Sequence, residues 1–186
     1  MHEAAPDMQK RLGEIINDER GDGGRILIPA FSVGRTQNIV WFLGNLIADG
    51  TIPEMPIFVD SPLSTKATKI LASYPELFDQ ETRDVLAAGR RPFFFDGVRY
   101  TASVEESKTL NGVRSGIIIS ASGMCESGRI VHHLKQTLGR KEDCLSAFKE
   151  CLACYEVRAV RCLGDGGRGA VDHKCHCAGY AAFACS

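Results

Sequence analysis

Residues 116–134 read GIIISASGMCESGRIVHHL, and this stretch decides the fold. The apolar, β-branched run Ile117–Ile119 predicts a buried strand, which stops at a small polar loop, Ser120–Gly123. A helical pattern then opens at about Glu126. Such a strand–loop–helix unit is suited to holding an anion, because backbone N–H groups, hydroxyls and the helix dipole all favour negative charge. Simple turn formation is the alternative interpretation of the same residues.

A second unit of this kind lies at Ile26–Trp41. Pro29 is expected to close its strand, since proline cannot donate to a central ladder, and Ser32 or Thr36 could cap its helix. Arg35 falls where the helix begins, and a cation there opposes the helix dipole. An anionic partner, either a carboxylate of the protein or a ligand, would offset that cost.

The other apolar runs continue the alternation of strands and helices. Runs typical of strands buried on both faces occur at Ile26–Ile28, Ile57–Val59, Pro92–Phe95 and Ile117–Ile119. Helical patterns occur at Gln37–Ala48, Thr65–Ser73, Glu81–Ala88 and Glu126–Leu138, and Met1–Arg20 reads as an amphipathic helix with Met8, Leu12, Ile15 and Ile16 on its apolar side. This order predicts an α/β fold, a doubly wound, mostly parallel sheet flanked by helices. Ligands of such sheets bind at the carboxyl ends of the strands.

Three segments, in this order, resemble the β-CASP domain of the metallo-β-lactamase-fold nucleases that process RNA: IPAFSVGRTQ (28–37), IFVDSPLSTKAT (57–68) and IIISASGMCESGRIVHHL (117–134). The resemblance runs from about Gly24 to Leu138. It implies that RNA is a partner and that the loops after the strands position its backbone. The residues expected to contact nucleic acid are Ser32, Arg35, Asp60, Ser61, Ser120, Ser122, Gly123 and Met124.

Several of these residues have a structural alternative. Met124 could pack against a base or fill the core, and Asp60 could orient Arg35 or a backbone turn. His132 and His133 are adjacent on a helix and therefore point about 100° apart, so they cannot both line one site well.

The resemblance also implies a chemistry, two zinc ions that activate water for attack on a phosphodiester. The ligands of those ions come mainly from the metallo-β-lactamase domain, including a His-x-His-x-Asp-His stretch that does not occur in this sequence. We therefore expect no catalytic residue, metal ligand or cofactor in this chain, and interpret it as a fragment of a metal-dependent RNA nuclease that is inactive alone. The alternatives are a stand-alone nucleic-acid-binding module and a protein-interaction module with a zinc-bearing tail.

The composition changes at residue 141, which predicts a domain at 1–140 and an irregular tail at 141–186. Seven of the eight cysteines lie between Cys144 and Cys185, and no strand comparable to the family's next strand is evident after Lys141. A shift of reading frame near Lys141 would make the tail an aberrant product. The alternative is a zinc element built from Cys151–Cys154 and His173–Cys177. Disulfides are the least favoured reading, since nothing indicates an oxidising compartment.

The formal net charge of −1 excludes a global attraction to nucleic acid, so any phosphate binding must come from a local cluster. No apolar run is long enough to cross a membrane and no signal-peptide pattern is present, which favours a cytoplasmic protein. Besides RNA, the expected partner is the metallo-β-lactamase domain, and homodimerisation is left open.

Overall fold

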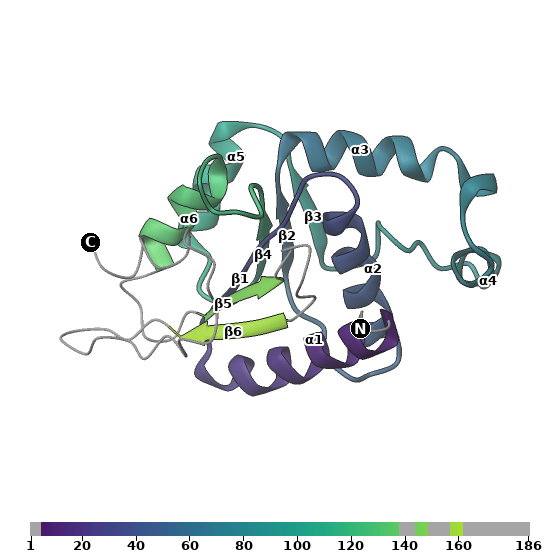
Figure 1. Cartoon of the computed structure of the whole chain (residues 1–186), viewed down its shortest axis with the longest axis horizontal. Coiled ribbons are helices and arrows are strands. Elements are labelled where there is room, and N and C mark those ends of the chain that lie inside the picture. Colours follow the sequence, from purple (N-terminus) through teal and green to yellow (C-terminus); the bar gives the residue numbers. More distant parts are fainter. Residues whose placement is uncertain (1–4, 138–143, 149–156, 162–186) are drawn as a thin grey trace.

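The computed structural model describes residues 5–137, 144–148 and 157–161. Its centre is a six-stranded sheet in the order β3-β2-β4-β1-β5-β6 (Figure 1). The strands are β1 Arg25–Pro29, β2 Ile57–Asp60, β3 Val98–Thr101, β4 Gly116–Ser120, β5 Cys144–Phe148 and β6 Val157–Arg161. Strands β1 to β5 pair in parallel and β6 is antiparallel to β5. The predicted α/β fold with a mostly parallel sheet is confirmed.

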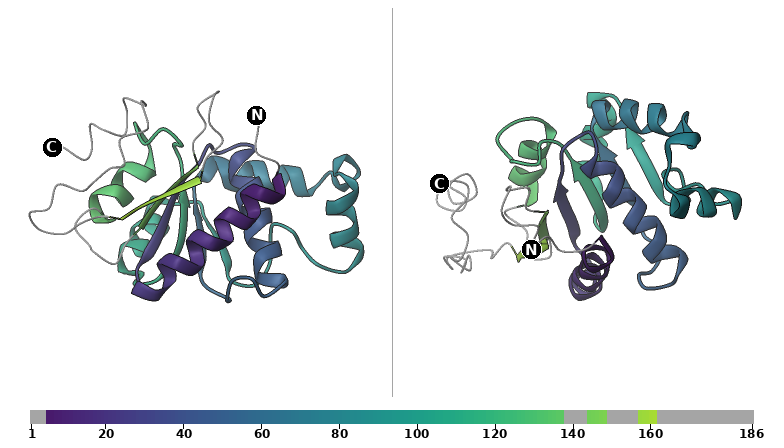
Figure 2. Two further views of the ribbon diagram at one scale, coloured as in Figure 1. Left: turned by 60° about the horizontal axis from the view of Figure 1, so that its bottom comes forward. Right: turned by 45° about the vertical axis from the view of Figure 1, so that its right-hand side comes forward.

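Helices cover both faces of this sheet (Figure 2). They are α1 Ala5–Glu19, α2 Arg35–Ala48, α3 Pro62–Ala72, α4 Gln80–Ala87, α5 Val104–Thr109 and α6 Arg129–Thr137, with short 3₁₀ turns η1 Arg20–Asp22, η2 Pro75–Leu77 and η3 Leu110–Gly112. The helix predicted from about Glu126 begins at Arg129, and α5 has no counterpart among the predicted helices.

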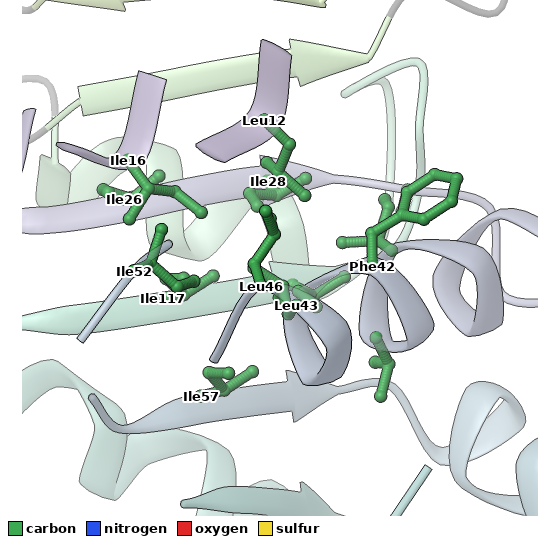
Figure 3. Packing of buried hydrophobic residues seen from close by; sticks show 14 of the residues in the cluster. Leu12, Ile16, Ile26, Ile28, Phe42, Leu43, Leu46, Ile52, Ile57 and Ile117 are labelled. Atoms are coloured by element: carbon green, nitrogen blue, oxygen red, sulfur yellow. The ribbon is translucent and has the colours of Figure 1, made fainter. Parts of the chain in front are cut away.

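One face of the sheet packs against α1 and α2 (Figure 3). The strand side chains on this face include Ile26, Ile28, Ile57 and Ile117, and the helices contribute Leu12, Ile16, Leu43 and Leu46. Burying each of these side chains stabilises the fold by about 1.5–3 kcal/mol. The burial of Leu12, Ile15 and Ile16 confirms the predicted apolar side of the first helix.

The opposite face packs against η3, the segment before α6, and α6 itself. Leu27, Phe58 and Ile118 alternate along the strands with the residues of the first face, and they meet Leu110, Cys125, Ile130 and Leu134. Because side chains alternate across a strand, two covered faces require consecutive apolar residues, as in Ile26–Ile28 of β1 and Ile117–Ile119 of β4. The sheet is therefore doubly wound.

The strand predicted at Pro92–Phe95 is wrong. These residues form turns, and the strand of this region is β3, Val98–Thr101. Phe93 is buried as a strand residue would be, but it packs against Phe78, with ring centroids 5.9 Å apart. An apolar run at a buried turn and an apolar run in a strand have the same composition, so the sequence pattern cannot separate them.

The expectation that no strand follows Lys141 is also wrong, because β5 and β6 lie in that part of the chain. β5 pairs with β1 at Ile26↔Cys144 and Leu27↔Leu145. Its residues are poor in β-branched side chains, so pairing with β1, not local propensity, accounts for this strand. The possible zinc ligands, Cys151–Cys154 and His173–Cys177, lie outside the described residues. The boundary at residue 140 stays a prediction.

In the part of the chain that the structure describes, no helix is both long and apolar enough to span a membrane.

Candidate nucleic-acid interface

The register of the parallel strands places their last residues in one row. Thr101 of β3 lies beside Asp60 of β2, Asp60 beside Ser120 of β4, and Ser120 beside Pro29 of β1. The loops that leave β1, β2 and β4 therefore start from the same edge of the sheet. This is the arrangement that the three sequence motifs predict for a ligand site.

The three loops also contact one another. Ser32 after β1 and Ser61 after β2 share a hydrogen bond, with their Oγ atoms 3.0 Å apart. Ser120 Oγ, at the end of β4, donates to the carbonyl oxygen of Asp60 at 3.1 Å. Gly123 lies against Phe31, so closely that a Cβ at residue 123 would be 3.2 Å from the Phe31 ring. Side chains of all three motifs thus converge on one region.

The loop after β1 is held by its own helix. Gly34 is the N-cap of α2, and its N–H donates to Gln37 Oε1 at 2.7 Å. Thr36 Oγ1 donates to the carbonyl oxygen of Phe31 at 2.7 Å, so neither Thr36 nor Ser32 caps the helix as the sequence suggested. Arg35 is the first residue of α2, as predicted, and is partly exposed.

The loop after β2 starts α3 directly. Ser61 is the N-cap of α3 and its Oγ accepts the N–H of Ser64 at 3.2 Å, with Pro62 in the first helical turn. Ser61, not Asp60, therefore caps this helix. Ser61 itself is buried.

Asp60 is fully buried and accepts hydrogen bonds from four side chains. The donors are Thr101 Oγ1, Ser107 Oγ at 2.6 Å, Arg129 Nη1 at 2.7 Å and His133 Nε2 at 2.6 Å. Arg129 also donates to the carbonyl oxygen of Ala102 at 3.2 Å. We call this set of five side chains the Asp60 network. It joins β2, β3, α5 and α6.

Burial alone would raise the pKa of Asp60, but the hydrogen bonds from His133, Ser107, Thr101 and Arg129 outweigh it and hold that pKa well below its ordinary value. Asp60 is therefore a carboxylate, which only accepts hydrogen bonds, so Nε2 of His133 carries a hydrogen. Nδ1 of His133 is buried and has no partner among the described residues.

The loop after β4 closes on itself. Ile130 N–H donates to the Ala121 carbonyl at 3.0 Å and Ser122 N–H donates to the Ser127 carbonyl at 3.3 Å. Gly128 adopts φ = 80°, and a Cβ there would lie 2.8 Å from the Ala121 carbonyl oxygen, so only glycine fits without a shift. At the tip of the loop the amide N–H of Met124 donates to Ser122 Oγ at 3.2 Å.

The side chains of this loop divide between core and surface. Cys125 is buried, whereas Met124 is 44% exposed, so the alternative that Met124 fills the core is wrong. Of the two histidines, His133 is buried and His132 is exposed, which agrees with the expectation that they cannot share one site.

Sequence reasoning missed three members of the Asp60 network: Thr101, Ser107 and Arg129. A signal for part of it was present, because Arg129 and His133 are four residues apart and therefore share a helix face. The suggested pairing of Asp60 with Arg35 is replaced by an ion pair with Arg129.

The described residues do not fit a zinc ion. No three His, Cys, Asp or Glu side chains gather among them. Asp60 and His133 are adjacent, but both carboxylate oxygens already accept hydrogen bonds.

A separate hollow of about 360 Å³ lies between α2 and residues 85–96, lined by side chains that include Trp41, Arg90 and Phe94. Residues 92–96 lead into the amino end of β3, and no candidate contact residue lines this hollow. The site at the carboxyl edge and this hollow are therefore different places.

Comparison with known proteins identifies the family. The family model described as Beta-Casp domain matches residues 36–147, more than half of the chain. The chain belongs to the Beta-Casp family. The Beta-Casp match includes the loops after β2 and β4 and ends within β5.

The similar proteins include a transcription termination factor, a ribonuclease and an RNase J-like protein. The chain is 33% identical over 130 residues to the transcription termination factor FttA of Lokiarchaeum sp. (strain GC14_75), covering 69% of this chain and 20% of that protein. It is 35% identical over 136 residues to ribonuclease TTHA0252 of Thermus thermophilus, covering 71% and 30%. It is 29% identical over 132 residues to the RNase J-like protein of Methanocaldococcus jannaschii, covering 71% and 30%. The Beta-Casp chain described here thus spans between 20% and 30% of the length of these relatives.

Proposed function

We propose that this chain is the RNA-binding part of a metal-dependent RNA nuclease and that it holds backbone phosphates at the carboxyl edge of its sheet. The observation that carries the proposal is the meeting of the three motif loops in one region, through the Ser32–Ser61, Ser120–Asp60 and Gly123–Phe31 contacts. The names of two similar proteins, a ribonuclease and an RNase J-like protein, support RNA as the substrate class.

Hydroxyl groups are the donors best placed for a phosphate. The Ser122 Oγ accepts a hydrogen bond from Met124 N–H, and among the described residues its own hydrogen is not donated. Ser32 and Ser61 share a single hydrogen bond between two hydroxyls, so one of the two hydrogens is left for another acceptor. The amides of Ser122 and Cys125 are used inside the loop and contribute less.

The charges nearby are compatible with an anion. Asp60 is fully buried and paired with Arg129, so the carboxylate does not project a net negative charge toward the loops. Arg35, at the start of α2, adds a partly exposed cation on the same edge. In this arrangement Ser122, Gly123, Met124, Ser32 and Arg35 contact the RNA, while the buried Asp60, Ser61 and Ser120 support them.

The longer protein would supply the two-zinc chemistry that activates water, from residues outside this chain. Because the His-x-His-x-Asp-His stretch does not occur here, we propose that the chain binds RNA and does not cleave it by itself. Its partners would be RNA and a metallo-β-lactamase domain, in the cytoplasm.

The test is binding of a short fluorescent single-stranded RNA, measured by anisotropy over a series of salt concentrations. Ser122→Ala is expected to weaken binding about fivefold to tenfold, the typical net effect of losing one hydrogen bond. Arg35→Ala is expected to weaken it and to reduce the slope of log K against log salt by about one.

The matched control is Arg83→Ala, which removes an exposed arginine of α4, a helix at the far end of the molecule (Figure 1). This variant is expected to bind like the unmodified chain. Equal losses for Arg35→Ala and Arg83→Ala would mean that any RNA binding is diffuse. An unmodified chain that binds no RNA at low salt would overturn the proposal.

A further inference from the structure

Both ends of the loop after β4 are attached to the same residue. At its start, Ser120 Oγ donates to the Asp60 carbonyl oxygen at 3.1 Å. At its end, Arg129 and His133, one helical turn apart on α6, donate to the Asp60 carboxylate at 2.7 Å and 2.6 Å. The backbone and the side chain of Asp60 therefore hold the two ends at once.

Asp60 is in turn fixed by elements that do not belong to the loop. Its carboxylate accepts hydrogen bonds from Thr101 of β3 and Ser107 of α5. Its backbone lies in register between β3 and β4. The carboxylate is therefore positioned by β3 and α5, and it holds α6 through Arg129 and His133.

Between its ends the loop is a closed unit. The hydrogen bonds of Ser122 with Ser127 and of Ile130 with Ala121 join its two sides, and they require the two ends of the loop to be held close together. Its placement relative to β1 and β2, where Ser32 and Ser61 lie, depends on where its ends are held. An RNA phosphate that bridges Ser122 and Ser32 requires that placement.

We propose that Asp60 is the positioning residue of the RNA-binding loop: it touches no RNA, and it holds the loop after β4 in the binding arrangement through Arg129 and His133. This inference rests on the proposed function for its effect on RNA binding. A loop that occupies the binding arrangement for only a fraction of the time loses affinity in proportion to that fraction.

Asp60→Asn isolates the role of the carboxylate, because asparagine has nearly the same shape but brings an NH₂ donor and no charge. The NH₂ group would then face two of the four donors around Asp60, which must turn or change tautomer to accept from it. We expect the loop to lose its fixed placement, RNA affinity to fall about tenfold, and the amides of Ser122–Cys125 to exchange hydrogen faster by a similar factor.

Variants of Arg129 test whether Asp60 acts through α6. Arg129→Gln removes the cation and is expected to weaken RNA binding nearly as much as Asp60→Asn. Arg129→Lys keeps a cation beside the Asp60 carboxylate but loses the hydrogen bond to the Ala102 carbonyl. It is expected to retain most of the RNA affinity that Arg129→Gln loses. The double variant Asp60→Asn, Arg129→Gln should bind no more weakly than Asp60→Asn alone, since the two residues act on one contact.

Each variant is compared at a temperature well below its own melting point. Ser107→Ala removes one of the four hydrogen bonds to Asp60 and replaces Asp60→Asn if the latter does not fold. It is expected to lower RNA affinity and speed amide exchange of the loop by a smaller factor than Asp60→Asn.

Tyr100→Phe is the control for a buried hydrogen bond elsewhere. It removes the bond to the Phe93 carbonyl on the other face of the sheet, and should change neither RNA affinity nor loop exchange.

The outcomes separate this inference from the proposed function. If the unmodified chain binds RNA and Ser122→Ala weakens binding, but the variants of Asp60, Ser107 and Arg129 bind like the unmodified chain with unchanged loop exchange, the positioning role is overturned and the function stands. If RNA does not bind but Asp60→Asn still speeds exchange at Ser122–Cys125 and not elsewhere, the function fails and the positioning of the loop is supported.

Discussion

The Asp60 carboxylate carries a negative charge at a fully buried position. Such a charge is costly unless hydrogen bonds replace the water that it loses. Four donors do so here, from residues 41 to 73 positions further along the chain. Only one of them, Arg129, is a permanent cation, and its side chain is 18% exposed. Replacing one partner leaves the others buried and unpaired, so the network is sensitive to single substitutions.

Asp60→Asn is expected to lower the free energy of unfolding by about 3 kcal/mol, the typical effect of breaking a buried ion pair from one side. Urea unfolding followed by circular dichroism measures this. The control is Asp84→Asn on α4, whose exposed carboxylate bonds to Gln80, and it should change stability by less than about 0.5 kcal/mol. Equal effects at the two positions would contradict the assigned network.

The low pKa of Asp60 also predicts a pH dependence of stability. In the unfolded chain the carboxyl has a pKa near 3.8, and folding lowers it. Its contribution to stability is therefore complete above that value and is lost as the pH falls below it toward the folded value. The stability difference between the unmodified chain and Asp60→Asn should be constant from pH 7 to pH 5 and should shrink between pH 4 and pH 2. A difference that is independent of pH over this range would contradict the assignment.

At the scale of elements, the strands β1, β2 and β4 could be predicted because each contains three consecutive apolar residues, which two covered faces demand. β3 could not be predicted, because it pairs only with β2 among the described strands and its burial varies from one residue to the next. Arg99 interrupts the apolar pattern of β3, whereas Phe93–Phe95 form an apolar run. The pattern therefore favoured a strand at Pro92–Phe95 over the true strand.

The candidate site was predicted only in part, because some of its features are local in the sequence and others are not. The loops after β1, β2 and β4 were located, because strand ends and helix starts are local features of the sequence. The donors to Asp60 come from β3, α5 and α6, and nothing local connects Ser107 or Arg129 with residue 60. That connection exists only through strand register and helix placement.

The loop before α6 depends on one glycine, so Gly128→Ala is expected to destabilise the fold by about 2 kcal/mol. Alanine is strained at φ = 80°, and its Cβ would meet the Ala121 carbonyl oxygen at 2.8 Å. Gly112→Ala is the control, because a Cβ there meets nothing within 4 Å. Thermal unfolding should separate the two variants clearly. A Gly128→Ala protein as stable as the control would show that the loop relaxes without cost.

At the scale of the whole molecule, the described residues form a three-layer α/β structure whose carboxyl edge offers hydroxyls and a cation but no cluster of metal ligands. Binding a phosphate and hydrolysing its ester need different groups: binding needs hydrogen-bond donors and positive charge. Cleavage needs a group that activates water, and the described part of this chain contains no donor set for zinc.

We therefore expect no RNA hydrolysis by this chain, with or without added zinc, when a labelled RNA is followed on a denaturing gel. EDTA-treated chain is the reference for background degradation. Cleavage by the unmodified chain that disappears in the double variant Ser122→Ala, Arg35→Ala would contradict this expectation, because contaminating nucleases would not respond to these substitutions.

The position of β4 between β1 and β2 affects how the chain folds as it is synthesised. The neighbours of β1, β4 and β5, are both translated long after it, so β1 has no described partner strand until Gly116–Ser120 has left the ribosome. Until then its backbone is unpaired on both edges, and Ile26, Leu27 and Ile28 lack the strands that later flank them. Because closing such a long loop is slow, the nascent chain is most exposed to wrong pairing, or to capture by a chaperone, in the interval before the β4 codons are translated.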